Sequence, residues 1–287
     1  MRHRHLHEAN RKSWNTATRA HNSHKKDQAA FLRGGGSTLF PEEIELLESI
    51  DGLRLVHLQC NAGQDSLSLA ALGAEVTGVD ISDEAIDFAR KLSIDSGIPA
   101  NFVRADVYDW LAEAERQPFD IVFCSYGALC WLSDLKLWAR GVADILSPNG
   151  RFVCIDFHPF SMVFDEHFKI AYPYFADGKP LTWDDGVGDY VGMSGEALAP
   201  SGFVEAETKY NNPHPVHEFQ WGTAEVLQAL IDAGLNIEVT REYPYSNGAK
   251  LFEDLVEVEG HRFTRPEEKP NLPLMWGVVA QKIEIAG

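Results

Sequence analysis

The chain has 287 residues, of which 45% are hydrophobic and 24% are charged, and this is typical of a soluble globular protein with a full core. Its formal net charge of −18 repels phosphate backbones and anionic lipid surfaces, which argues against nucleic-acid and membrane partners. No apolar run approaches about 20 residues, so no transmembrane helix is expected. The N-terminus has charges but no apolar stretch behind them, so it does not read as a secretory signal.

The cysteines indicate a reducing compartment. They lie in or beside apolar runs and show no paired spacing, so we expect packed, reduced thiols in a cytoplasmic protein. They are Cys60, Cys124, Cys130 and Cys154.

Residues 1–50 are predicted to form interrupted helices that cover the rest of the fold. Residues 10–20 form a polar helix that carries Trp14, and the three glycines at 34–36 break the chain. Pro41 then begins a helix whose first turn contains Glu42 and Glu43, where acids favour the positive helix end. Because the histidines at 3, 5 and 7 lie in a polar terminus, we predict no metal site there.

The central stretch is residues 55–65, which read as a buried strand, a tight turn and the start of a helix near Asp65. Such a turn places backbone N–H groups and the positive end of a helix at the carboxyl edge of a sheet. Open α/β sheets bind nucleotides and related ligands at this edge. This stretch therefore predicts a ligand site.

The following residues repeat the alternation of strand and helix. Strands are predicted at 74–80, 101–104, 119–124 and 151–157, and amphipathic helices follow Ser82 and Ser133. This alternation predicts a mainly parallel sheet covered by helices on both faces. Residues 158–216 show many aromatic side chains and no clear helix, and a helix at 223–233 with strands at 235–243 and 275–283 completes the pattern.

Five segments, in order and at suitable spacing, resemble the class I S-adenosylmethionine-dependent methyltransferases. They are residues 55–63, 78–82, 105–107, 119–122 and 146–151. The first loop of that family usually reads Val-Leu-Asp-x-Gly-Cys-Gly-x-Gly. Here Cys60 and Gly63 match, whereas His57 stands in place of the acid, and Gln59 and Asn61 in place of glycines. The Leu-Gln-Cys-x-x-Gly variant is similar to that of a bacterial branch of the family.

The resemblance implies a fold and a domain organisation. We expect a single Rossmann-like α/β domain over 1–287, with a seven-stranded, mainly parallel sheet, an antiparallel edge strand and helices on both faces. Residues 1–50 would be an N-terminal helical cover, 51–157 the cofactor-binding core, 158–216 an aromatic-rich substrate lid, and 217–287 the last helix and edge strands.

The resemblance also implies roles for individual residues. Asp80 would accept hydrogen bonds from the ribose hydroxyls of S-adenosylmethionine, and Ile81 would press on the adenine. Asp106 would accept the adenine amino group near the Val107 N–H. Gln59, Cys60, Asn61 and Gly63 would line the methionine part of the cofactor. Ser125 or Tyr126 would lie beneath the sulfonium. Trp14 and His21 would close the N-terminal side of the site.

Methyl transfer from a sulfonium is an in-line displacement that needs no metal, so the enzyme mainly aligns donor and acceptor. A general base helps only if the acceptor must lose a proton. The candidates are Asp156 and His158, which follow the fifth predicted strand, and His217, which precedes the last helix.

The sequence therefore predicts methylation of a small molecule, with O- or N-methylation favoured because both are common in the family, and a place in secondary metabolism. Two alternatives stay open. A nicotinamide-dependent oxidoreductase would require three glycines in the first turn, of which only Gly63 is present. A cofactor-binding module without catalysis is the other. The acceptor and the oligomeric state are left open.

Overall fold

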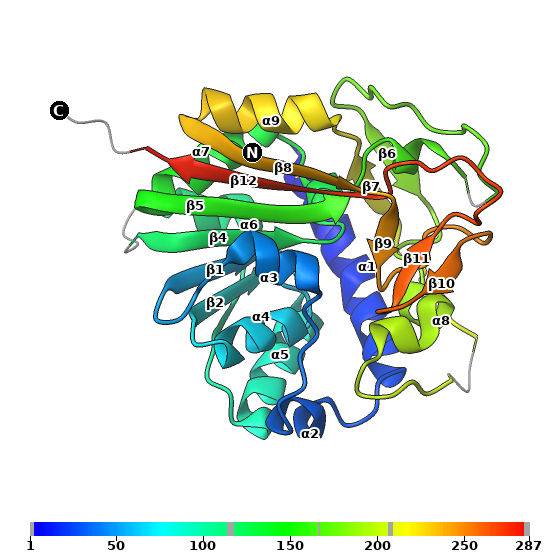
Figure 1. Ribbon diagram of the computed structural model, residues 1–287, viewed down its shortest axis with the longest axis horizontal. Helices are drawn as coiled ribbons and strands as arrows, with labels where there is room; N and C mark the ends of the chain where they lie inside the picture. The colour runs from blue at the N-terminus through cyan, green and yellow to red at the C-terminus, as the bar shows by residue number, and fades with distance from the viewer. Residues whose placement is uncertain (1–2, 114–117, 166, 206–208, 284–287) are drawn as a thin grey trace.

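A seven-stranded sheet forms the centre of the computed structural model, which describes residues 3–113, 118–165, 167–205 and 209–283 (Figure 1). The strand order is β3-β2-β1-β4-β5-β12-β8. The bounds are β1 Arg54–Leu58, β2 Glu75–Asp80, β3 Asn101–Arg104, β4 Phe119–Ser125, β5 Leu146–Phe157, β8 Leu235–Tyr243 and β12 Met275–Lys282.

Strands β1 to β5 pair in parallel, and β12 runs antiparallel to both of its neighbours, β5 and β8. The chain moves outward from β1 through β2 to β3, then returns to place β4 on the other side of β1. The strand order therefore reverses between β1 and β4, and in open α/β sheets ligands bind at such a switch point. The predicted fold class, including the antiparallel pairing at one edge, is confirmed.

Two layers of helices cover the sheet because its strands are apolar on both faces. Val56 and Val122 pack with side chains of α6, α7 and α9, whereas Leu55 and Ile121 pack with side chains of α3 and α4. Alternate residues of a strand point to opposite faces, so the continuous apolar runs predicted this double burial. These helices and α5, which packs beside α4, are α3 Pro41–Leu47, α4 Gln64–Ala71, α5 Asp83–Ser96, α6 Val107–Ala112, α7 Leu135–Ile145 and α9 Thr223–Asp232.

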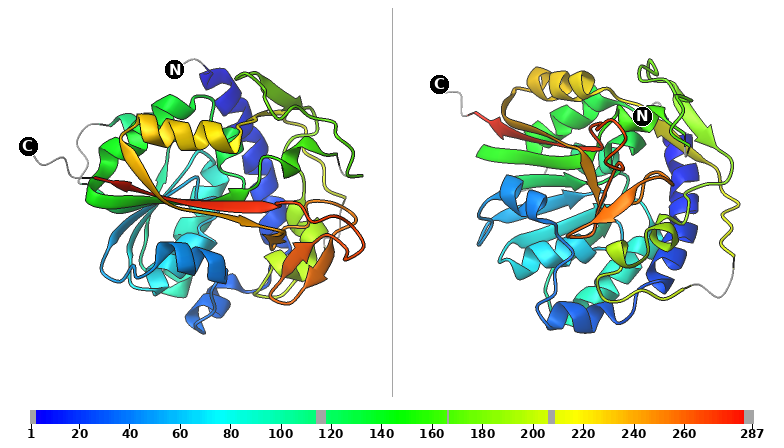
Figure 2. Two further views of the ribbon diagram at one scale, coloured as in Figure 1. Left: turned by 45° about the horizontal axis from the view of Figure 1, so that its top comes forward. Right: turned by 45° about the vertical axis from the view of Figure 1, so that its right-hand side comes forward.

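The remaining segments gather beyond the carboxyl ends of the parallel strands, at the right of Figure 1 and in both views of Figure 2. Two small sheets, β6-β7 and β10-β11-β9, lie there with the helices α1 and α8. Their bounds are α1 Arg4–Ser23, β6 Pro180–Trp183, α8 Tyr190–Ser194, β7 Val216–Phe219, β9 Tyr245–Asn247, β10 Val256–Val258 and β11 Arg262–Thr264. The helix α2, Gln28–Arg33, packs on α5.

The structure differs from the sequence prediction mainly in these covering segments. The first helix is longer than predicted, and the stretch 158–216 contains α8 and short 3₁₀ helices at Ser161–Val163 and Gly195–Leu198. The three-stranded sheet was not predicted at all, because each of its strands has only three residues, too few to show an alternating pattern. Within the described ranges, no helix has both the length and the apolar character needed to cross a membrane.

Candidate functional site

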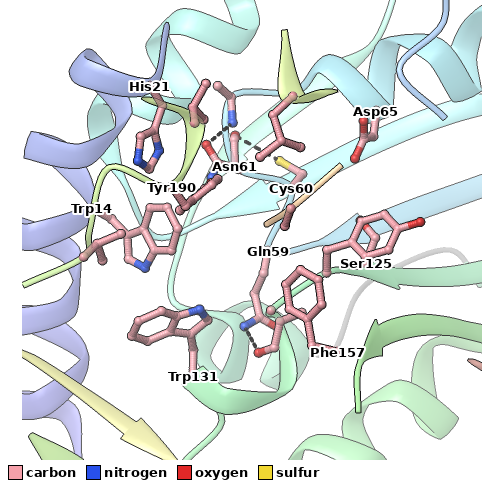
Figure 3. Close-up of a pocket in the computed structure, with 18 of the residues that line it drawn as sticks. Trp14, His21, Gln59, Cys60, Asn61, Asp65, Ser125, Trp131, Phe157 and Tyr190 are labelled. Atoms are coloured by element: carbon pink, nitrogen blue, oxygen red, sulfur yellow. Dashed lines mark hydrogen bonds between the residues drawn. The ribbon is translucent and has the colours of Figure 1, made fainter. Parts of the chain in front are cut away.

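A cavity of about 870 Å³ lies at the switch point, enclosed by α1, the loops after β1, β2 and β4, and the covering segments (Figure 3). Its volume is in the upper part of the range of about 300–1,000 Å³ that is usual for small-molecule sites. Trp14 and Trp131 lie on one side of it in Figure 3, and Ser125 and Phe157 on the other.

The loop after β1 has an unusual backbone that explains its sequence. Gln59, Asn61 and Gly63 have φ angles of 55°, 48° and 80°, in the left-handed region. Asn tolerates this conformation better than other non-glycine residues, so the loop keeps its shape with a single glycine. Gly63 lies outside the cavity wall. A Cβ there would lie 2.6 Å from Ala89 and 2.9 Å from Phe102, so packing requires this glycine.

Asp80 ends β2 and fixes the same loop. Its Oδ2 accepts a hydrogen bond from the Asn61 N–H at 2.9 Å, and its Oδ1 accepts one from the Ser82 N–H at 2.8 Å. Burial raises the pKa of Asp80 to about 6, against the lowering effect of these backbone N–H groups. Each carboxylate oxygen has two lone pairs, so both can still accept a bond from a ligand in the cavity.

His57 is a buried, neutral imidazole at the base of the cavity. Its Nδ1 lies 2.9 Å from the Ser66 Oγ, and its Nε2 lies 3.3 Å from the Ser125 Oγ. Burial lowers the pKa of His57 to about 3. The position at which the resembling family has an acid therefore carries no charge here.

Helix α1 connects the cavity wall to the ends of β2 and β3. The His7 Nδ1 lies 2.7 Å from the Asp106 Oδ2, while the Asp106 Oδ1 accepts a bond from the Tyr108 N–H at 2.9 Å. Burial alone would raise the pKa of Asp106, but its bond with His7 and the other contacts lower it overall. Further along α1, Asn15 accepts a bond from the Ser82 Oγ at 2.7 Å.

Lys25 and Asp65 add side chains of opposite charge to the wall. The Thr38 Oγ1 donates to the Asp65 Oδ1 at 2.5 Å, and Asp65 opens α4. Burial lowers the pKa of Lys25 to about 8, although the negative charge of Asp65 opposes this. Near them, the Gln59 side chain donates to the Ala128 carbonyl at 2.7 Å, while its Oε1 is buried without a partner among the described residues. An acceptor buried in this way is costly unless a ligand satisfies it.

The structure brings most of the predicted cofactor residues together. Those in the cavity wall are Trp14, His21, Gln59, Cys60, Asn61, Asp80, Ile81, Asp106, Val107, Ser125 and Tyr126. Gly63 supports the loop from behind, as described above. The wall also contains residues that the sequence analysis did not single out for this site, including Lys25, Asp65, Trp131, Tyr190 and Glu218.

The three candidate bases, in contrast, lie outside the cavity wall. The Asp156 carboxylate is buried and accepts bonds from the backbone N–H groups of Gly127, Leu129 and Phe157, so it holds the turn after β4. Both ring nitrogens of His158 have partners, the Glu242 Oε1 at 3.1 Å and the Phe160 N–H at 3.1 Å.

The third candidate base, His217, lies on β7, where its Nδ1 is 3.0 Å from the Thr182 Oγ1. Its neighbour Glu218 lines the cavity instead. Successive side chains of a strand point to opposite sides, so on β7 His217 lies away from the cavity and Glu218 lines it; with four residues, β7 is too short for its sequence to reveal this alternation.

Comparisons with known proteins agree with this geometry. Residues 56–150 match the model of a family described as "Methyltransferase domain". Among curated proteins, the chain is 32% identical over 107 residues to the ubiquinone biosynthesis O-methyltransferase of Proteus mirabilis, which covers 37% of this chain and 43% of that protein. It is 27% identical over 139 residues to the enzyme of the same name from a Chelativorans species, and the match covers 48% of this chain and 54% of that enzyme. The chain thus spans about half the length of the curated relatives it matches.

Solved structures extend the likeness over most of the chain. An S-adenosylmethionine-dependent methyltransferase from Mesorhizobium loti is 22% identical, covers 86% of this chain and 99% of its own, and has a TM-score of 0.55. One from Clostridium acetobutylicum is 12% identical, covers 90% of this chain and 91% of its own, and has a TM-score of 0.54. The described chain therefore has the fold of S-adenosylmethionine-dependent methyltransferases, and its residues 56–150 match a methyltransferase-domain family.

Proposed function

We propose that this protein is an enzyme that transfers the methyl group of S-adenosylmethionine to a small-molecule acceptor. The observation that carries the proposal is the position of Asp80. Its carboxylate ends β2 at the switch point, fixes the left-handed loop and lines a cavity of about 870 Å³. A carboxylate at this place can accept hydrogen bonds from both hydroxyls of a ribose.

The charges of the wall fit the remaining parts of this cofactor, which carries a sulfonium, an ammonium and a carboxylate. Lys25 would hold the carboxylate, while Asp65 and the unpaired Gln59 Oε1 would accept from the ammonium. Ile81 and Val107 would enclose the adenine, and Asp106 would accept its amino group. His57 is neutral, so it adds no second positive charge beneath the sulfonium.

S-adenosylmethionine supplies an electrophilic methyl group on a positively charged sulfur, which an acceptor displaces in line. The protein's part is to align the two molecules and to exclude water. Ser125 ends β4 at the cavity and Tyr126 follows it there, so the two would flank the methyl group. Helix α1 and the covering segments contribute residues to the cavity wall and so reduce its contact with solvent, which strengthens each polar contact inside it.

The nicotinamide alternative is less well supported. A dinucleotide needs close approach of the backbone to its pyrophosphate, which is why glycines occupy the first turn of such sites. Here the side chains of Gln59 and Asn61 line the cavity at that turn. We also propose that the protein acts in the cytoplasm on a soluble metabolite. Its four cysteines, which are free thiols, support this location.

Titration calorimetry with S-adenosylhomocysteine and with NAD tests the proposal. We expect S-adenosylhomocysteine to bind and NAD not to bind. The variant Asp80→Asn should bind S-adenosylhomocysteine at least about tenfold more weakly, which corresponds to about 1.4 kcal/mol. Asp87→Asn removes the same charge from an exposed position on α5 and should bind like the wild type. Binding of NAD alone, or unchanged affinity in a folded Asp80→Asn protein, would contradict the proposal.

A further inference from the structure

The cavity has an aromatic region, one ring of which, Tyr190, lies beside Asn61 of the loop after β1. Its rings come from four separate segments and pack around the buried residues Ala17, Val187 and Val216: Trp14 on α1, Trp131 after β4, Trp183 on β6 and Tyr190 on α8. Trp14 and Trp131 meet edge to face, with ring centroids 5.5 Å apart, and lie side by side in Figure 3. Indole rings attract cations that approach their faces.

Glu218 contributes a carboxylate to the same region. The Trp183 Nε1–H donates a hydrogen bond to its Oε2 at 2.9 Å, which fixes the side chain beside the ring. Its Oε1 takes part in no hydrogen bond within the described ranges, and no lysine, arginine or histidine described there forms an ion pair with Glu218. Burial raises the pKa of Glu218. Glu218 is half-buried, and a carboxylate partly removed from water without an ion-pair partner among the described residues favours a positively charged occupant.

The position of Glu218 relates this region to the reaction site. Strand β7 packs against Leu129–Trp131, the 3₁₀ turn that follows β4. That turn also carries Ala128 at its start, whose carbonyl accepts from Gln59 in the loop after β1. Glu218 therefore lies near the turn after β4, on which Cys130 also lines the cavity and is within reach of the negative charge of Glu218. The exposed carboxylates Asp184 and Asp185 line the cavity on the segment after β6 and add negative charge to this region.

We infer that Glu218 and the indole rings of Trp14, Trp131 and Trp183 form the acceptor subsite, and that the acceptor is a small-molecule amine bound as its ammonium ion. This inference rests on the proposed methyltransferase function and selects N-methylation within it. The carboxylate pairs with the ammonium, and the rings surround it. The same carboxylate accepts the proton that the ammonium must lose before its nitrogen can react.

The step balances without a further reactant. One N–H proton of the ammonium passes to the Glu218 carboxylate, which leaves a lone pair on nitrogen. That lone pair forms the new nitrogen–carbon bond as the carbon–sulfur bond breaks, and the electrons of the broken bond remain on sulfur as a neutral thioether. The methylated amine carries the positive charge away, and Glu218 later releases its proton to solvent.

The test compares amines and alcohols that share one skeleton. Calorimetry is carried out on the full chain saturated with S-adenosylhomocysteine, using tryptamine with tryptophol, tyramine with tyrosol, and phenethylamine with 2-phenylethanol. We expect at least one amine to bind tenfold or more tightly than its alcohol. Glu218→Gln keeps an acceptor for the Trp183 N–H but removes the charge, so it should abolish the preference for that amine. In turnover with S-adenosylmethionine, the same amine should gain a methyl group on nitrogen, and Glu218→Gln should slow this at least tenfold at saturating amine.

His217→Gln is the matched control, because it changes the neighbouring side chain, which bonds Thr182 away from the cavity. It should keep the preference for the amine. The inference is overturned if no amine binds, if the alcohols bind as tightly as the amines, or if Glu218→Gln retains the preference. Saturation with S-adenosylhomocysteine is measured first: its failure would contradict the proposed function, whereas binding of S-adenosylhomocysteine without an amine preference would contradict only the amine subsite.

Discussion

At the scale of single residues, His57 is the clearest departure from the resembling family. A charged acid at this position would need a compensating donor or cation, whereas a neutral imidazole needs only the two hydroxyls of Ser66 and Ser125. The substitution therefore replaces a buried charge by a chain of hydrogen bonds beneath the ligand. The fold can keep that chain only while the imidazole stays unprotonated.

This requirement predicts an acid limit to stability. The pKa of His57 is about 3 in the folded protein and 6.5 in its ordinary state, so below pH 6.5 the unfolded chain binds a proton that the folded chain does not. Stability is then lost as the pH falls from about 6.5 towards about 3, by up to about 1.4 kcal/mol per pH unit. His57→Gln removes this contribution. In urea unfolding at pH 7, 6, 5 and 4, its stability should fall less steeply than that of the wild type.

The control is His261→Asn, at an exposed hairpin position with a φ angle of 57°, which Asn tolerates. It should keep the wild-type slope. His21 has a pKa lowered to about 4 by burial and is present in all three proteins, so its contribution cancels in the comparison. Equal slopes for His57→Gln and the wild type would show that His57 is not the buried neutral group described here.

Several of the residues predicted to bind the cofactor line the cavity because they follow strands. Asp80, Asp106 and Ser125 each end or follow a parallel strand, and the topology brings such ends together whatever the intervening loops do. The three candidate bases do not line the cavity. Asp156 also ends a strand, but its carboxylate turns to the backbone of the preceding loop, and sequence alone does not reveal such a bond.

At the scale of elements, α1 contributes to the cavity wall and bonds to the segments after β2 and β3. Its contacts lie at one helical spacing: His7 with Asp106, Arg11 with Asp83, and Asn15 with Ser82. Positions three or four apart share one face of a helix, so these three side chains attach a single face to the ends of β2 and β3. Ser82 and Asp83 follow Asp80, which is proposed to hold the ribose, and Asp106 is itself proposed to accept the adenine amino group. The cover and the cofactor site are therefore joined by direct bonds.

We predict that loosening α1 speeds ligand release. Asn15→Ala removes the acceptor for the Ser82 Oγ and the donor to Asp83, so α1 should open more often. In stopped-flow displacement, S-adenosylhomocysteine should dissociate about three- to tenfold faster, with little change in the association rate, since affinity changes act mostly through dissociation. Lys12→Ala, exposed on the same helix, is the control and should dissociate at the wild-type rate. An unchanged rate in Asn15→Ala would mean that α1 does not retain the ligand.

The covering sheets were beyond sequence prediction for a different reason. Their strands are three or four residues long and are held by contacts with distant segments. For example, the Asn247 side chain of β9 donates to the Glu42 carboxylate of α3 at 2.9 Å and to the Tyr126 hydroxyl after β4 at 2.9 Å. A pattern over so few residues carries little information about which partner it meets. The aromatic content of 158–216 nevertheless indicated that this stretch packs against the rest of the fold. Trp183 and Tyr190 pack beside the cavity.

At the scale of the whole molecule, the cavity joins segments that lie far apart in the described chain. Its wall takes residues from the N-terminal helix, the sheet loops, the aromatic segment and the region of β9 to β11. A ligand that touches all of these stabilises them together, by RT ln(1 + [L]/Kd) if it binds only the folded state. If residues 1–287 form one cooperative domain, as predicted, a ligand in the cavity should also make the centre of the sheet open less often.

Cys124 and Cys154 report on that opening. They are paired in register on β4 and β5, are at most 1% exposed, and have thiol pKa values raised by burial. A thiol reagent should modify them only when the sheet unfolds. If the chain is one cooperative unit, S-adenosylhomocysteine at 100 times its Kd should slow their modification about 100-fold, as followed by mass spectrometry of the two peptides. NAD at the same concentration should have no effect. If modification of these two cysteines proceeds at the same rate with and without S-adenosylhomocysteine, the sheet opens independently of the cavity, and the covering segments do not form one domain with it.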